Sequence, residues 1–176
     1  FLPMRPVQIL LNNFLYDISE VPIPMDSVDA DLIRRPRRWD MRLIRDFMLV
    51  VGPVSSLFDF LTFWVLLRVL HAGEALFQTG WFVESLATQV LVIFVIRTRG
   101  NPLRSRPSRL LTLTSLAVVA LAALLPLTPL APALGFVAPP PRFFLILAAM
   151  VAVYLAGVQG VKTWFYRRFF PPYPTG

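Results

Sequence analysis

The chain lacks cysteine and contains a single histidine, His71. Disulfide frameworks, thiolate metal sites and multi-histidine metal sites are therefore excluded. Nucleotide-binding and hydrolase motifs such as GxGxxG, the Walker loop, GxSxG and HExxH are also missing. The side chains that remain for ligand binding are oxygen and amide donors, which suit Mg²⁺ or Ca²⁺ better than zinc or copper.

Charge is scarce as well. Charged residues make up 15% of the 176 positions, whereas a soluble domain carries about 25%. Hydrophobic residues reach 56% and the mean hydropathy is +0.65, so the chain is expected to lie in a lipid bilayer. The net charge is +7, but the basic residues fall between apolar runs. They are expected to orient a membrane protein, and no nucleic-acid partner is expected.

Five apolar segments are long enough to cross a bilayer, which takes roughly 20 residues at a rise of 1.5 Å each. The predicted fold is an all-α, polytopic transmembrane helix bundle with five spans, of which the first is the least apolar. The chain begins at Phe1 without a recognisable signal peptide, so we expect a piece of a longer polypeptide. The predicted spans are residues 6–25, 47–70, 77–96, 110–130 and 143–165.

The basic residues predict the orientation of these spans. Fourteen of the 17 lie on one side, in the links after the first and third spans and near the C-terminus (Lys162, Arg167 and Arg168), and only Arg5, Arg68 and Arg142 lie on the other. By the positive-inside rule the larger group is cytoplasmic, which places the C-terminus inside the cell. Residues 1–169 are predicted to form the membrane domain, and residues 170–176 a disordered cytoplasmic tail.

The first span carries polar groups that a membrane helix rarely tolerates. Asn13, Asp17, Glu20 and Pro24 follow helical spacing and share one face. An ionised carboxylate at bilayer depth costs at least about 2.5 kcal/mol. These side chains are therefore expected to face a protein interior, a water-filled cavity or a bound cation.

Within this face, Asn13 and Asp17 are the main candidate metal ligands, one helical turn apart. The alternative for Asp17 is an ion pair with an Arg of another helix. Glu20 is a secondary candidate, since a solvated carboxylate at the entrance explains it equally well, and Tyr16 is expected to pack beside the site. Pro22 and Pro24 either interrupt the helix next to the carboxylates, as in many transporter ion sites, or follow a helix that ends at residue 21.

Asp59 lies in the middle of the second span and is a further candidate metal ligand. No second carboxylate is near it in sequence, so a structural hydrogen bond to a neighbouring helix is an equal alternative. Glu84 and Gln89 in the third span are weaker candidates. Glu84 is expected near the outer interface, and glutamine inside a membrane is more often a hydrogen-bonding partner between helices.

Taken together, these motifs resemble the C-terminal membrane domain of P-type cation-transporting ATPases, and among them the bacterial magnesium-importing ATPases. In that family the sixth membrane helix carries an Asn and, four residues later, an Asp that help to hold the cation. An acidic cluster and a basic Arg-x-Pro-like stretch follow that helix. The matching segments are 11–17 (LNNFLYD), 28–36 (VDADLIRRP), 52–59 (GPVSSLFD), 79–83 (TGWFV) and 96–99 (IRTR).

The resemblance implies that the five spans are the last five of a ten-helix membrane domain in the bacterial inner membrane. It implies Mg²⁺ as the transported ion, with Asn13 and Asp17 at cation-site positions. ATP would act only through an aspartyl-phosphate motif and a nucleotide-binding domain that lie upstream. Those upstream parts and the first five helices are the implied partners, so this segment alone is not expected to hydrolyse ATP.

Two other interpretations remain open from the sequence. The segment could belong to a P-type pump for Ca²⁺ or another cation, or it could be a freestanding, ion-coupled permease subunit. A purely structural membrane anchor explains neither Asp17 nor the two prolines that follow it.

Overall fold

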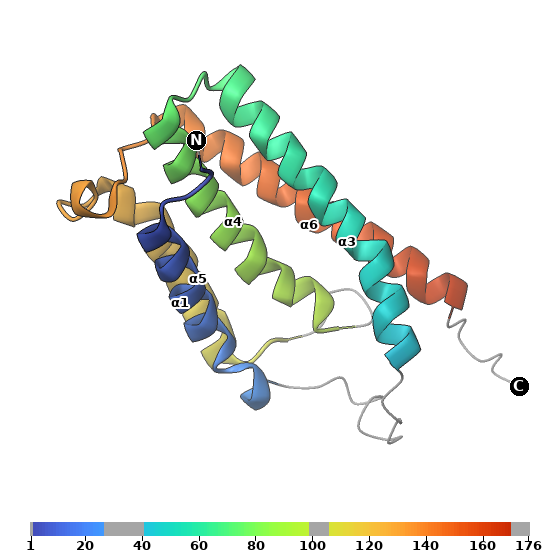
Figure 1. Cartoon of the computed structure of the whole chain (residues 1–176). Coiled ribbons are helices and arrows are strands. Elements are labelled where there is room, and N and C mark those ends of the chain that lie inside the picture. The colour runs from blue at the N-terminus through green and yellow to red at the C-terminus, as the bar shows by residue number, and fades with distance from the viewer. Residues whose placement is uncertain (1, 27–40, 99–105, 170–176) are drawn as a thin grey trace, which may run out of the picture.

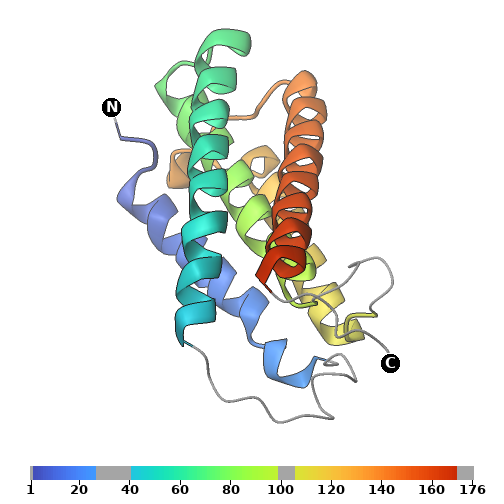
Figure 2. The ribbon, with the colours of Figure 1, turned by 90° about the vertical axis from the view of Figure 1, so that its right-hand side faces the viewer.

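The computed structural model describes residues 2–26, 41–98 and 106–169, and these residues form helices and no strand (Figures 1 and 2). Five α-helices follow one another along the chain, and short 3₁₀ or π turns extend several of them. The elements are α1 (Pro6–Glu20), a 3₁₀ turn (Ile23–Met25), α3 (Met41–Trp64), a π turn (Val65–Val69), α4 (Glu74–Ile96), α5 (Arg109–Leu124), 3₁₀ turns (Leu125–Leu127 and Pro132–Leu134) and α6 (Pro141–Phe169).

Helix α4 lies at the centre of the bundle. It packs against α1 and α5 on one side and against α6 on the other, while α3 packs mainly on α6 (Figure 1). The ends of α1, α4 and α6 and the beginnings of α3 and α5 lie at one end of the bundle (Figures 1 and 2). This alternation of direction agrees with the predicted order of spans.

Four helices are long and apolar enough to cross a membrane: Ile44–Val69, Glu74–Ile96, Arg109–Leu127 and Pro141–Arg168. Helix α1 has 15 residues, which gives a length of about 22 Å, less than the roughly 30 Å of a bilayer core. The multi-pass helical architecture is confirmed. The fifth span stays a prediction.

Prolines account for two of the differences from the predicted bounds. The predicted first span reached residue 25, but α1 ends at Glu20 because Pro22 and Pro24 lack the amide hydrogen that a helix needs. The fourth span similarly turns from α-helix to 3₁₀ geometry at Leu125, next to Pro126. Helix α3 begins at Met41, before the predicted start at residue 47, and α6 extends beyond the predicted span at both ends, since each includes charged residues that flank its apolar run.

A glycine allows α4 to approach its neighbours closely. A Cβ atom added at Gly80 would lie 2.7 Å from Leu66 Cδ2 and 3.1 Å from Phe143 Cε2, on the π turn and α6 respectively. The bulkiest fully buried side chains around this point are Phe77 and Phe82 of α4. The core of the bundle therefore depends on a missing side chain at Gly80.

Gly80→Val is expected to destabilise the protein by about 1–3 kcal/mol, because the added methyl groups overpack this contact. Gly157→Val on α6 is the matched control, since nothing lies within 4 Å of a Cβ atom there. Denaturant unfolding of both variants in detergent micelles measures the difference. Equal losses at the two positions would show that the contact at Gly80 is unimportant.

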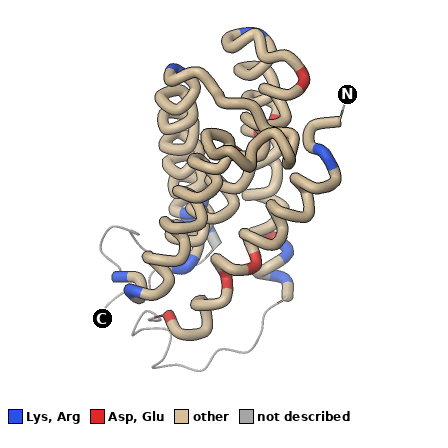
Figure 3. Tube along the Cα trace, turned by 90° about the vertical axis from the view of Figure 1, so that its left-hand side faces the viewer, with Lys and Arg blue, Asp and Glu red and all other residues tan. Residues whose placement is uncertain are grey.

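The basic residues of the described ranges lie toward the ends of the bundle, and the middle of the bundle is mostly uncharged (Figure 3). One basic residue, Lys162, is buried and links α6 to the end of α4. Lys162 of α6 has no exposed surface, and its Nζ donates to the carbonyl oxygens of Val95 (2.7 Å) and Thr98 (3.1 Å). A cation at the C-terminal end of α4 also interacts favourably with the helix dipole.

Candidate cation site

Helix α1 carries the main candidate ligands, and side-chain hydrogen bonds fix its N-terminal end. The buried Gln8 Nε2 donates to the carbonyl oxygens of Leu134 (3.2 Å) and Gly135 (3.3 Å), between α5 and α6. Arg5 Nε donates to Gln78 Oε1 of α4 at 3.3 Å. These contacts hold the start of α1 against two other parts of the bundle, the link between α5 and α6 and helix α4.

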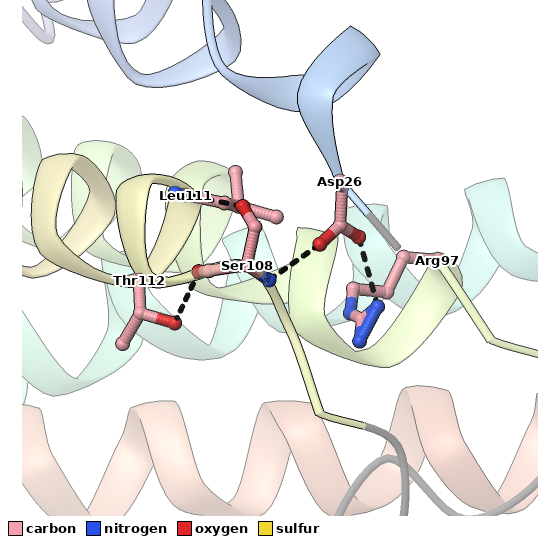
Figure 4. A network of polar contacts seen from close by, with 5 residues as sticks. All are labelled: Asp26, Arg97, Ser108, Leu111 and Thr112. Atoms are coloured by element: carbon pink, nitrogen blue, oxygen red, sulfur yellow. Dashed lines mark hydrogen bonds and ion pairs between the residues drawn. The ribbon is translucent and has the colours of Figure 1, made fainter. Parts of the chain in front are cut away.

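The opposite end of α1 is fixed by a buried ion pair (Figure 4). Asp26, just after the 3₁₀ turn, lies 2.8 Å from Arg97 Nη1 at the end of α4, and the two side chains are only 10% and 9% exposed. The other oxygen of Asp26 accepts a hydrogen bond from the Ser108 backbone N–H at 2.6 Å. Ser108 in turn caps α5, because its Oγ accepts from the Leu111 N–H. One carboxylate thus joins α1, α4 and α5.

Between these anchors, α1 has two distinct faces. The face against α4 and α5 buries Gln8, Asn12, Leu15 and Ser19. Asn13 and Asp17 lie on the other face and are exposed, together with Leu10, Phe14 and Ile18. The candidate ligands therefore point away from the described bundle.

The neighbouring candidates lie at the edge of this open face. Glu20 and Tyr16 are half-buried, and the Tyr16 hydroxyl interacts with the carboxylates of Glu20 and Asp17. Within residues 2–26, 41–98 and 106–169, no three His, Cys, Asp or Glu side chains gather as a metal site would require. The described part of the chain thus offers two or three candidate oxygen ligands on one helix, fewer than the six that an octahedral Mg²⁺ shell takes.

Asp59 lies on α3, which packs mainly on α6. Its carboxylate lies in the neighbourhood of Glu84 of α4 and of Tyr154 of α6. Gln89, the other weak candidate, is exposed, and its Nε2 donates to Ser85 Oγ on its own helix at 2.9 Å. Asp59 thus has a carboxylate neighbour that its sequence surroundings did not reveal.

Sequence reasoning underrated Glu84 and did not single out Asp26. Glu84 was expected near the outer interface, but it is only 2% exposed in the centre of the bundle. A signal was present, because Gly80, Trp81, Glu84 and Thr88 share one face of α4 at helical spacing. Asp26 and Arg97 offered no such signal, since 71 positions separate them. The predicted acidic and basic link at residues 28–36 lies outside the described residues, and so does the predicted tail, 170–176.

Comparison with known proteins identifies the family of this chain. Residues 1–164 match the family described as cation transporting ATPase, C-terminus. The chain belongs to this family. The cation-transporting ATPase family was the one that the helix motifs resembled, and the resemblance is thereby confirmed.

Two relatives of this chain have a more specific name, Magnesium-transporting ATPase, P-type 1. The protein from Salmonella typhimurium is 38% identical over 174 residues, and the one from Escherichia coli K12 is 41% identical over 174 residues. Each alignment covers 96% of this chain and 19% of the relative. The chain thus spans about a fifth of the length of these curated relatives.

Proposed function

We propose that this segment is the C-terminal membrane part of an ATP-driven Mg²⁺ importer in the bacterial inner membrane. Relatives at about 40% identity over nearly the whole chain carry the name of magnesium-transporting ATPases, and this observation carries the proposal. The four apolar spans and the alternating helix directions support a multi-pass membrane location. The predominance of basic residues on one side favours a cytoplasmic C-terminus.

In this proposal Asn13 and Asp17 ligate Mg²⁺ from α1. Their exposure supports this role, because the open face of α1 also carries apolar side chains and would be covered by helices of the upstream polypeptide. Mg²⁺ prefers octahedral oxygen ligands and usually keeps several waters, so one or two carboxylates suffice. Upstream helices would complete the shell, with Glu20 near the entrance.

ATP hydrolysis is assigned to the upstream domains, since this segment contains no phosphorylation or nucleotide-binding motif. The role of α1 is to hold its ligands while the upstream domains drive the helices between inward-open and outward-open states. Because both ends of α1 are anchored to the bundle, the ligands move together with α4 and α5 as one unit.

The test uses the full-length protein that contains this segment, reconstituted in lipid vesicles with ATP. We expect uptake of Mg²⁺ in preference to Ca²⁺. Preferential Ca²⁺ transport would instead assign the segment to a calcium pump. A gene whose reading frame starts near Phe1, without an upstream Asp-Lys-Thr-Gly-Thr sequence, would indicate a freestanding permease subunit and overturn the proposal.

A further inference from the structure

Lys162 of α6 is an unusual basic residue in two respects. Of the 17 Lys and Arg residues in the chain it is the only lysine, and it has no exposed surface although it lies in a helix long and apolar enough to cross a membrane. An ammonium group removed from water is costly unless hydrogen bonds replace its hydration. Here the carbonyl oxygens of Val95 (2.7 Å) and Thr98 (3.1 Å) accept from its Nζ.

These two carbonyl groups lie on both sides of Arg97 in the chain. Helix α4 ends one residue before Arg97, and the last carbonyl groups of a helix have no partner within the helix itself. Lys162 binds the carbonyl oxygens of Val95 and Thr98 and thereby fixes the backbone around Arg97. The Arg97 side chain in turn reaches the Asp26 carboxylate at 2.8 Å. The position of Arg97 therefore depends on a residue of α6.

The two basic residues suit their different acceptors. An ammonium group is compact and has three N–H donors that can point to separate oxygen atoms, whereas a planar guanidinium group matches a carboxylate. Lys162 meets two backbone carbonyl groups from different residues, and Arg97 meets the carboxylate of Asp26. A lysine at position 162 and an arginine at position 97 are thus the residue types that this arrangement requires.

Together these contacts join four helices at one end of the bundle. Lys162 belongs to α6 and Arg97 to the end of α4, while Asp26 directly follows the 3₁₀ turn after α1. Asp26 also accepts a hydrogen bond from the Ser108 N–H at the start of α5, at 2.6 Å (Figure 4). The C-terminal end of α1 is therefore held by a continuous series of buried polar contacts that begins at Lys162.

We propose that Lys162 is a positioning residue for the cation site and acts on α1 through Arg97 and Asp26. The inference rests on the proposed function, in which Asn13 and Asp17 of α1 ligate Mg²⁺. Mg²⁺ demands nearly ideal octahedral geometry, so a displacement of the helix that carries its ligands lowers the affinity. Loss of the Lys162 ammonium group releases the end of α4 and, with it, the partner that holds α1 in place.

The test measures transport by the full-length protein in lipid vesicles, with Mg²⁺ varied on the side opposite to ATP. Lys162→Met keeps an unbranched apolar side chain and removes the donors. We expect the half-saturating Mg²⁺ concentration to rise about tenfold, at the lower end of the effects of partners outside the ligand shell. The maximal rate should change little, because ATP hydrolysis is assigned to the upstream domains. Arg168→Met, exposed in the last turn of α6, is the matched control and should change neither quantity.

The two kinetic quantities separate positioning from folding. A variant that only folds less well contains less active protein, so its maximal rate falls while its half-saturating Mg²⁺ concentration stays at the wild-type value. That result for Lys162→Met would overturn the inference. Lys162→Gln decides if Lys162→Met fails to fold, since its shorter, neutral side chain still offers a donor. It should also raise the half-saturating concentration, and an unchanged value would again overturn the inference.

A double variant tests whether Lys162 acts through the ion pair. Once Asp26→Asn has removed the pair, Lys162 has no contact left to transmit, so Lys162→Met/Asp26→Asn should have the half-saturating concentration of Asp26→Asn alone. Independent effects would instead multiply, which would contradict the route through Arg97. If the wild-type protein does not transport Mg²⁺, the proposed function fails and this inference fails with it. Wild-type transport of Mg²⁺ with an unchanged half-saturating concentration in the Lys162 variants overturns this inference alone.

Discussion

Replacing Asp17 with Asn in the full-length protein is expected to abolish Mg²⁺ uptake. The substitution keeps the size of the side chain and removes its charge. Near a protein surface a unit charge at about 4 Å interacts by about 4 kcal/mol with another unit charge, and each 1.4 kcal/mol is about tenfold in affinity. Cation affinity should thus fall by more than about 100-fold. Uptake into vesicles at a fixed Mg²⁺ concentration measures the loss.

Asp46→Asn provides a matched control for this experiment. Asp46 is also an exposed helical carboxylate, but it forms a surface ion pair with Arg45 at 2.8 Å near the start of α3. Removing a pair of this kind costs about 0–1 kcal/mol, so uptake should remain near the wild-type rate. Wild-type uptake by Asp17→Asn would contradict the assignment of α1 as the ligand-bearing helix.

Much of the architecture could be predicted because apolar runs and prolines act locally. Four of the predicted spans correspond to helices long enough to cross a bilayer, and Pro22 ends α1 for a reason that is visible in the sequence. The face that α1 buries could not be predicted in the same way. Asn12 and Ser19 mark one polar face and Asn13 and Asp17 another, and only the position of α4 and α5 decides between them.

The environment of Glu84 also could not be predicted from the sequence. Glu84 was expected near the outer interface, but it lies in the middle of α4, and the neighbouring helices cover this central helix along most of its length. Asp59 lies 25 residues earlier in the chain than Glu84, on α3, so its position near Glu84 depends on how the helices pack. Local periodicity identifies polar residues within a membrane helix, while tertiary packing decides which of them meet.

The largest structural effect is expected at the ion pair between Asp26 and Arg97. Asp26→Asn should lower the free energy of unfolding by about 3–5 kcal/mol, because it removes the carboxylate that balances a buried guanidinium. The Asn side-chain oxygen can still accept the hydrogen bond from the Ser108 N–H. The substitution therefore isolates the ion pair from the cap of α5. Denaturant unfolding of the full-length protein in detergent measures the change.

Asp46→Asn again serves as the control: both ion pairs span 2.8 Å, but the control pair is exposed and lies within α3, whereas the pair of Asp26 and Arg97 is buried and joins two elements. The side chains of Arg97 and Asp26 are 9% and 10% exposed, whereas those of Arg45 and Asp46 are 66% and 41% exposed. A surface pair is worth about 0–1 kcal/mol, so the control should unfold almost as wild type does. Equal losses for the two variants would contradict the role of Asp26 as an anchor. A large loss at Asp26 alone would show that the end of α1, and with it the position of Asp17, depends on this one buried carboxylate.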